Sequence, residues 1–189
     1  MNITFDKAYK LVLSEINNTL SQVNINEVVR LTKEILKAKK IYFIGAGRMG
    51  IMLSTFCMRL YQLGFKSFVI GSIICEPINS NDLLIVASSS GETQSTLVMV
   101  KKALEFGAKV FTITANLNST IAKLSAGCLL LKGPSSIEDA DENVVFSKQP
   151  MKTLFSQSLF ILLDSIALML MEKTKQNAAK MAKRHTNLE

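Results

Sequence analysis

The stretch 83-LLIVASSSGET-93 decides the fold of this chain. Its first five residues, Leu83–Ala87, are all apolar, which predicts a strand buried on both faces. The polar run Ser88–Thr93 follows at once, and apolar residues at helical spacing then continue to Phe106. A buried strand joined by a short polar turn to a helix is typical of a parallel sheet whose strands alternate with helices. The stretch therefore predicts an α/β fold.

The same alternation extends to both sides of this stretch. Strands are expected at Ile41–Ile44, Ser67–Ile70, Leu83–Ala87, Val110–Thr114 and Cys128–Leu131. The helices between them are expected at Met49–Leu63, Thr93–Phe106 and Ser119–Ser125. This spacing suits right-handed crossovers between parallel strands. The sequence thus predicts a three-layer αβα sandwich of the flavodoxin-like kind, with a five-stranded parallel sheet.

Further helices are expected before and after the sheet. Apolar residues three or four apart predict two N-terminal helices, marked by Phe5, Ala8, Val12, Ile16 and Leu20 and by Val28, Leu31, Ile35 and Leu36. Near the C-terminus, the aperiodic and acidic segment Gly133–Gln149 is interpreted as a loop. A long helix then runs from Met151 to about Glu172, and a polar tail follows it.

Length and composition limit the class of protein. A chain of 189 residues fits one domain over residues 1–189, and 48% hydrophobic residues indicate a globular protein. The apolar surplus favours burial between subunits, so a homo-oligomer is expected. Three widely spaced cysteines favour neither disulfides nor a zinc site and suit a reducing cytoplasm. The first residues lack the apolar core of a signal peptide, and Leu154–Met171 is interrupted by polar residues, which favours a buried helix over a membrane span.

The net charge of +7 suits nucleic acid, a membrane surface or a phosphorylated substrate. The positive residues are scattered along most of the chain, as they are on solvated helix faces. We therefore expect neither a nucleic acid partner nor a membrane partner.

The run Gly45-Ala46-Gly47-Arg48-Met49-Gly50 matches GxGxxG and lies between a predicted strand and a predicted helix. Free backbone N–H groups at such a helix start attract phosphate. A dinucleotide site would also place an acidic residue at the end of the second strand. That end reads Val69-Ile70-Gly71-Ser72, so a nicotinamide cofactor is not expected. The glycines are interpreted as a tight turn beside another ligand.

The run Ser88–Thr93 is the more specific signal. The hydroxyls of Ser88, Ser90 and Thr93 converge with the free N–H groups of a helix start, which makes a compact phosphate cradle. The alternative is a capping box, formed by Ser89 and Glu92 three residues later. A cap needs only one hydroxyl, so phosphate binding is favoured, and both roles can coexist.

With these motifs in place, the chain resembles a sugar isomerase (SIS) domain. Its C-terminal part is similar to the 6-phospho-3-hexuloisomerase family, because of Gln149-Pro150-Met151, Leu162-Leu163-Asp164 and Arg184-His185-Thr186-Asn187-Leu188-Glu189. Met58-Arg59-Leu60 and Gly64-Phe65 add to the resemblance, which covers essentially the whole chain.

The resemblance implies a homotetrameric isomerase that interconverts D-arabino-hex-3-ulose 6-phosphate and fructose 6-phosphate, with no cofactor and no metal. The substrate-binding residues that we expect are Gly45, Gly47, Arg48, Ser88, Ser89, Ser90 and Thr93. Two positions depart from the family. Met49 replaces a serine of the glycine turn, and Ser156 replaces the glutamate that is the family's candidate base. A serine hydroxyl is far too weak a base for this chemistry.

The expected catalytic residues are His185, the position of Ser156, and Glu92. His185 is the only histidine, and the resemblance implies that it opens the sugar ring or carries a proton in a neighbouring subunit's site. Glu92 is the alternative carboxylate nearest in sequence to the cradle, and other candidates in loops are Glu76, Asp141 and Glu142. Asp164, inside the apolar helix, could be catalytic, but the interpretation that we favour is a partner for a polar group or a cap for a neighbouring element. One histidine and scattered cysteines cannot build a metal site.

Two other functions are left open by the sequence. The first is a non-catalytic module that binds a phosphosugar, because Ser156 removes the base while the cradle remains. The second is a DNA-binding regulator, since SIS domains occur in such proteins. That function needs a separate helix-turn-helix, whereas the two N-terminal helices are interpreted as parts of the domain itself.

Overall fold

The computed structural model describes residues 3–133, 147–151 and 153–188. Five parallel strands form one sheet in the order β2-β1-β3-β4-β5. Their bounds are β1 Ile41–Ile44, β2 Ser67–Val69, β3 Leu83–Ala87, β4 Lys109–Thr114 and β5 Gly127–Leu130. The helices are α1 Phe5–Ser21, α2 Ile25–Lys37, α3 Arg48–Leu63, α4 Gln94–Glu105, α5 Thr120–Leu124, α6 Thr153–Lys173 and α7 Ala178–Ala182. The predicted flavodoxin-like sandwich is confirmed.

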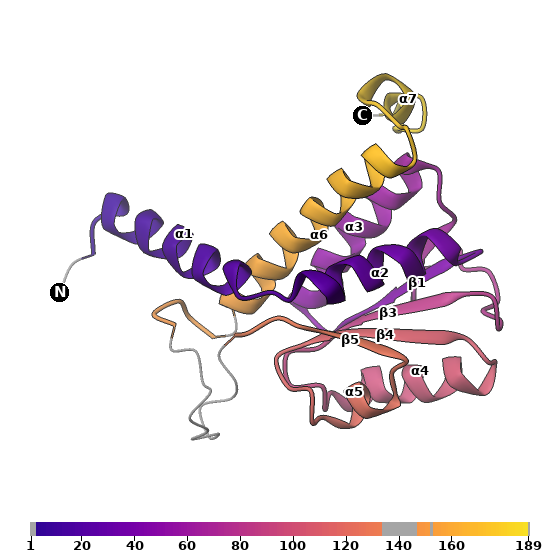
Figure 1. The fold of residues 1–189 in the computed structure, drawn as a ribbon, viewed down its shortest axis with the longest axis horizontal. Coiled ribbons are helices and arrows are strands. Elements are labelled where there is room, and N and C mark those ends of the chain that lie inside the picture. Colours follow the sequence, from indigo (N-terminus) through magenta and orange to yellow (C-terminus); the bar gives the residue numbers. More distant parts are fainter. Residues whose placement is uncertain (1–2, 134–146, 152, 189) are drawn as a thin grey trace.

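Each face of the sheet has its own apolar core. Figure 1 shows α2, α3 and α6 on one face and α4 and α5 on the other. Alternate residues of a strand point to opposite faces, so Phe43 and Ile85 join the first core while Tyr42 and Leu84 join the second. All five residues of β3 are buried, because β3 is central and covered on both faces. This is the burial that the run of apolar residues predicts.

The observed elements differ from the predicted bounds by one or two residues at most sites, for an identifiable reason. Thr93 and Ser119 were placed inside their helices, but they are the capping residues that precede α4 and α5. Cap residues keep an extended backbone. Of the predicted loop Gly133–Gln149, residues 134–146 lie outside the described part of the chain.

α1 and α6 differ sharply in burial. α1 extends away from the body of the molecule (Figure 1), only Thr19 in it is buried, and Phe5 is 83% exposed. α6 is long and apolar enough to cross a membrane, but 56% of its most apolar window is buried inside the molecule. Its residues belong to the main core. α6 is therefore a core helix of this fold.

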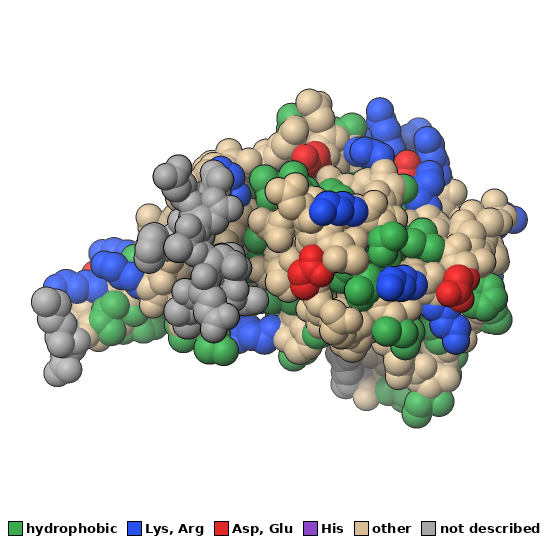
Figure 2. Space-filling view, turned by 90° about the horizontal axis from the view of Figure 1, so that it is seen from below, with side chains coloured by type: hydrophobic (Ala, Val, Ile, Leu, Met, Phe, Trp, Pro, Cys, Tyr) green, Lys and Arg blue, Asp and Glu red, His purple; other side chains and the backbone are tan. Residues whose placement is uncertain are grey.

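Figure 2 shows the side of the molecule that carries α4 and α5. Lysine and arginine side chains are scattered there among apolar and acidic ones, and they form no continuous stripe on this side. This distribution agrees with the interpretation of the positive charge as solvated helix faces.

Candidate functional site

The loops after β1 and β3 meet at the carboxyl edge of the sheet, because β1 and β3 are neighbouring parallel strands. Between them lies a cavity of about 130 Å³. It is lined by Ala46, Met49, Ala87, Ser88, Ser89, Ser90 and Thr93. The two motifs that the sequence singled out are thus brought together in space. We call this cavity the cradle.

The serine loop of the cradle is shaped by its own hydroxyls. Ser88 Oγ accepts from the Gly91 backbone N–H (3.1 Å) and lies 3.2 Å from Thr93 Oγ1. Ser90 Oγ accepts from the Glu92 N–H at 3.3 Å. Gly91 has φ +67°, and a Cβ added there would overlap the Ser119 side chain. Only glycine fits this turn, which presses the loop against the start of α5.

The capping-box interpretation of this loop is wrong. The cap of α4 is Thr93, and its side chain makes no capping hydrogen bond. The Ser89 hydroxyl is buried and has no hydrogen-bond partner among the described residues. Glu92 points elsewhere, because its carboxylate accepts from the backbone N–H of Thr120 at 2.7 Å. No side chain of the loop therefore occupies the N–H groups at the start of α4 in the way that a capping box would.

The Glu92 carboxylate stabilises the start of α5 in this structure, through a hydrogen bond from the Thr120 backbone N–H. The hydrogen bond from the Thr120 backbone N–H lowers the pKa of Glu92 below its ordinary value, and Lys123 adds to this effect. A carboxylate held in this way is a weaker base than a free one. The proposal that Glu92 acts as a base remains a prediction.

The glycines after β1 allow a close approach of backbone segments. A Cβ at Gly45 would lie 3.0 Å from the carbonyl oxygen of Ala87 in β3, and one at Gly50 would collide with the carbonyl of Gly45. Gly47 caps α3 with φ +56°, a backbone region that glycine favours. The turn is tight, as the sequence indicates, and it brings the start of α3 next to the serine loop.

Arg48 and Ser156 connect this turn to the start of α6. Arg48 Nε donates to Ser156 Oγ (3.1 Å), and the Ser156 hydroxyl donates to the Thr153 carbonyl (2.9 Å). Ser156 is completely buried. Its hydroxyl therefore ties Arg48, at the start of α3, to the start of α6. The catalytic role expected at this position stays untested, since no base is present there.

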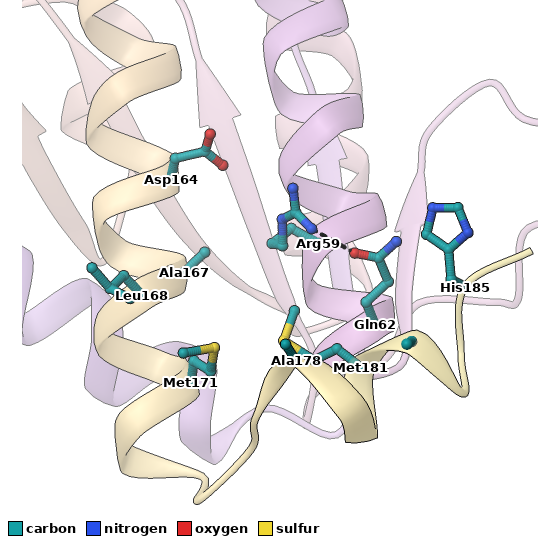
Figure 3. Close-up of a pocket in the computed structure, with 10 residues that line it drawn as sticks. Arg59, Gln62, Asp164, Ala167, Leu168, Met171, Ala178, Met181 and His185 are labelled. Atoms are coloured by element: carbon teal, nitrogen blue, oxygen red, sulfur yellow. Dashed lines mark hydrogen bonds between the residues drawn. The ribbon is translucent and has the colours of Figure 1, made fainter.

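A second cavity, of about 470 Å³, lies at the other end of α3 and α6 (Figure 3). We call it the tail pocket, because the C-terminal tail closes one side of it. It is lined by Arg59, Gln62, Asp164, Ala167, Leu168, Met171, Ala178, Met181, Ala182 and His185. Arg59 Nη1 donates to Gln62 Oε1 at 2.8 Å. His185 is exposed, and its Nδ1 lies 2.9 Å from the Thr186 carbonyl oxygen.

The tail pocket and the cradle are separate within one chain. Arg48, beside the cradle, and Arg59, in the tail pocket, are eleven residues apart on α3. At 1.5 Å per residue this is about 16 Å. His185 therefore does not reach the cradle of its own chain. The structure thus divides the candidate residues between two cavities. This separation is compatible with the expectation that His185 acts in a neighbouring subunit's site.

The other candidate carboxylates also lie away from the cradle or outside the described residues. Glu76 pairs with Lys40 (3.4 Å), which directly precedes β1 at the amino edge of the sheet. Asp141 and Glu142 lie outside the described part of the chain.

The sequence analysis did not identify Glu15, whose side chain holds the segment that precedes α6. Its carboxylate accepts from Ser147 Oγ (2.6 Å), the Lys148 N–H (3.0 Å) and Gln149 Nε2 (2.9 Å). Burial raises the pKa of Glu15, but these hydrogen bonds outweigh it and leave the pKa below its ordinary value. A single glutamate inside an amphipathic helix carries no signal of such long-range partners.

Comparisons with known proteins agree on one family. Residues 34–163 match the SIS domain model. The chain is 35% identical over 178 residues to a 3-hexulose-6-phosphate isomerase of Bacillus subtilis, covering 94% of this chain and 95% of that one. It is 30% identical over 179 residues to the Mycobacterium gastri enzyme of the same name, covering 95% and 88%.

A solved structure from Methanococcus jannaschii, described as inferring a 3-hexulose-6-phosphate isomerase function, is similar throughout. Its TM-score is 0.84 and its sequence identity 30%, with 97% of this chain and 99% of that chain covered. Sequence and fold thus agree over nearly the full length.

Proposed function

This chain belongs to the SIS domain family and within it to the 3-hexulose-6-phosphate isomerases, and on this basis we propose that it interconverts hex-3-ulose 6-phosphate and fructose 6-phosphate. The observation that carries the proposal is the cradle, in which the serine loop and the glycine turn meet. The hydroxyls of Ser88, Ser90 and Thr93 offer donors to a phosphate oxygen. Arg48, next in sequence to the cradle residue Met49, is proposed to add a positive charge for the phosphate.

The reaction moves one proton between two adjacent carbons. A base removes the proton at carbon 2 of the hex-3-ulose, the C–H electron pair forms the enediol double bond, and the carbonyl oxygen at carbon 3 gains a proton. Return of a proton to carbon 3, with loss of one from the oxygen at carbon 2, gives fructose 6-phosphate. His185 is proposed to carry the proton between the oxygens, because an imidazole gains and loses a proton near neutral pH.

We further propose that the protein is a cytoplasmic homotetramer in which His185 serves a neighbouring subunit's cradle. The separation of about 16 Å along α3 supports this arrangement, since a proton carrier must lie within hydrogen-bond reach of the sugar. The exposed apolar residues of α1 support assembly as well, because Phe5, Tyr9 and Leu13 are 83%, 40% and 59% exposed. Such residues are usually covered by a partner.

The second candidate function is a module that binds a phosphosugar without converting it. The observation that favours it is Ser156, whose hydroxyl is engaged by Arg48 and by the Thr153 carbonyl. If no other group in the protein acts as the base, the cradle still binds a phosphosugar but the protein does not convert it.

One experiment separates these functions: incubation of the protein with fructose 6-phosphate in D₂O. The enediol exchanges its carbon-bound proton with solvent, so the proposed isomerase places deuterium at carbon 3, which NMR detects. Deuterium at carbon 1 instead would show an aldose-ketose isomerase and contradict the proposed substrate pair. Thermal stabilisation by fructose 6-phosphate without exchange would show the binding module.

A further inference from the structure

The missing glutamate leaves open which group removes the carbon-bound proton. Most described carboxylates are already engaged. Glu15 and Glu92 accept the hydrogen bonds given above, Glu27 accepts from the Leu130 N–H, Glu34 pairs with Lys109, Glu76 and Asp82 pair with Lys40, and Asp6 pairs with Lys10. A base needs a free lone pair that faces a space in which substrate can lie. None of these seven carboxylates lines the cradle or the tail pocket. Asp82 Oδ1 has no partner among the described residues, but Asp82 lies beside Lys40 at the amino edge of the sheet, away from the cradle.

Asp164 meets this requirement for a base. Among the described residues, its carboxylate has no hydrogen bond and no ion pair, and it lines the tail pocket. The remaining described carboxylates, Glu105 and Glu172, line neither the cradle nor the tail pocket. Among the described residues, Asp164 thus makes none of the polar contacts that the structural role favoured by the sequence requires.

The tail pocket also places Asp164 beside useful partners. Figure 3 shows the Asp164 carboxylate pointing from α6 toward Arg59 on α3, with His185 across the pocket mouth. The volume of about 470 Å³ is within the range of pockets that hold small ligands. A carboxylate, an imidazole and a guanidinium in one cavity are groups that can remove a proton, carry a proton and stabilise a developing enediolate charge.

Asp164 cannot serve the cradle of its own chain. Asp164 and Ser156 are eight residues apart on α6, which corresponds to about 12 Å. A base must come within about 3 Å of the proton that it removes. The cradle has phosphate donors but no free carboxylate among its described residues, and the tail pocket has the carboxylate but not the phosphate donors. Each cavity contains what the other lacks.

We infer that the active site is shared between two copies of this chain, in which the tail pocket of one copy faces the cradle of the other and its Asp164 is the catalytic base that replaces the missing glutamate. This inference rests on the proposed function. Asp164 takes the proton from carbon 2, the C–H electrons form the enediol, and the same carboxyl group returns a proton to carbon 3. His185 of the same copy gives a proton to one oxygen and takes one from the other, so the protein ends unchanged.

The inference is tested by restoring activity between two inactive variants. Asp164→Asn removes the base, and the double variant Ser88→Ala with Thr93→Val removes two of the cradle hydroxyls. Each alone should lose at least about 100-fold in deuterium exchange, the low end of a general base's contribution. Co-expressed in equal amounts, the two should recover about a quarter of wild-type activity. The reason is that half of the randomly formed pairs are mixed, and each mixed pair contains one intact site of two.

Three controls make the result specific. Asp164→Asn co-expressed with His185→Ala should recover nothing, because both changes affect the same half of the site. Glu172→Gln removes an exposed carboxylate from the same helix and should keep full activity. The thermal midpoint of Asp164→Asn should stay within about 2 °C of wild type, since Asp164 is an exposed surface residue.

The outcomes distinguish this inference from the proposed function. Asp164→Asn with wild-type exchange would overturn the inference and leave the isomerase function standing. Failure of the mixed assemblies to regain activity would overturn the shared site. A wild-type protein that exchanges no proton of fructose 6-phosphate would overturn the proposed function and the inference together.

Discussion

Removal of single hydroxyls from the cradle should weaken sugar phosphate binding in a graded way. Thr93→Val keeps the shape of the side chain and removes only its hydroxyl. A hydrogen bond to a charged group contributes about 1.5 to 3 kcal/mol. In the free protein, however, Thr93 Oγ1 lies 3.2 Å from Ser88 Oγ. Ligand binding exchanges this bond for one to phosphate, so the loss should be near the lower limit, about tenfold in Kd.

Ser88→Ala should have a larger and different effect. The Ser88 hydroxyl also accepts from the Gly91 N–H, so its removal leaves a buried donor unpaired as well as a phosphate bond unmade. We expect a loss of about 100-fold in affinity together with a lower thermal midpoint, whereas Thr93→Val should leave the midpoint nearly unchanged. Thus only Ser88→Ala should lower both the affinity for fructose 6-phosphate and the thermal midpoint.

Calorimetric titration with fructose 6-phosphate measures both effects, and fructose without phosphate is the control ligand. Ser95→Ala is the matched control variant, because Ser95 is exposed on the first turn of α4 and does not line the cradle. Its affinity should equal that of wild type. If Thr93→Val and Ser88→Ala both bind fructose 6-phosphate like wild type, the phosphate site is not the cradle and our reasoning from the serine loop is refuted.

Three further predictions concern stability and assembly. Gly91→Ala should lower the thermal midpoint by at least about 4 °C more than Gly71→Ala, since both glycines have positive φ but only Gly91 would overlap Ser119; equal losses would contradict the clash. The stability that the ionised Glu15 contributes is present above its ordinary pKa of 4.5 and is lost as pH falls through its lower folded pKa, so the difference in thermal midpoint between wild type and Glu15→Gln should be full at pH 7 and should shrink as pH falls below 4.5; a difference independent of pH would contradict this. Light scattering at micromolar concentration should give a tetramer, and Leu13→Lys on the exposed face of α1 should give smaller species; a monomeric wild type would exclude a shared site.

Much of the fold was determined by the sequence alone, because it depends on local periodicity. A run such as Leu83–Ala87 can be satisfied only where both faces of a strand are covered, and helical spacing after Thr93 then leaves the chain few topologies. The position of the cradle could also be predicted from the sequence, because it depends on the order of the strands and on the loops that follow them. Loops that follow neighbouring parallel strands must meet at the carboxyl edge, so Gly45 and Ser88 could be brought together without coordinates.

Only the tertiary structure decided which polar side chains are engaged and which are free. Glu92 suits a capping box by sequence spacing, yet its carboxylate binds the start of α5, because hydrogen bonds depend on distance in space and not on separation along the chain. Glu15 and Gln149 are joined across 134 positions, which no periodic pattern records. Asp164 and His185 line one pocket, away from the cradle, since Asp164 lies on α6 and the tail after α7 packs against α3 and brings His185 there. The local sequence pattern determined the helices and strands. Packing between segments that are distant in sequence determined where their charged side chains lie and what they contact.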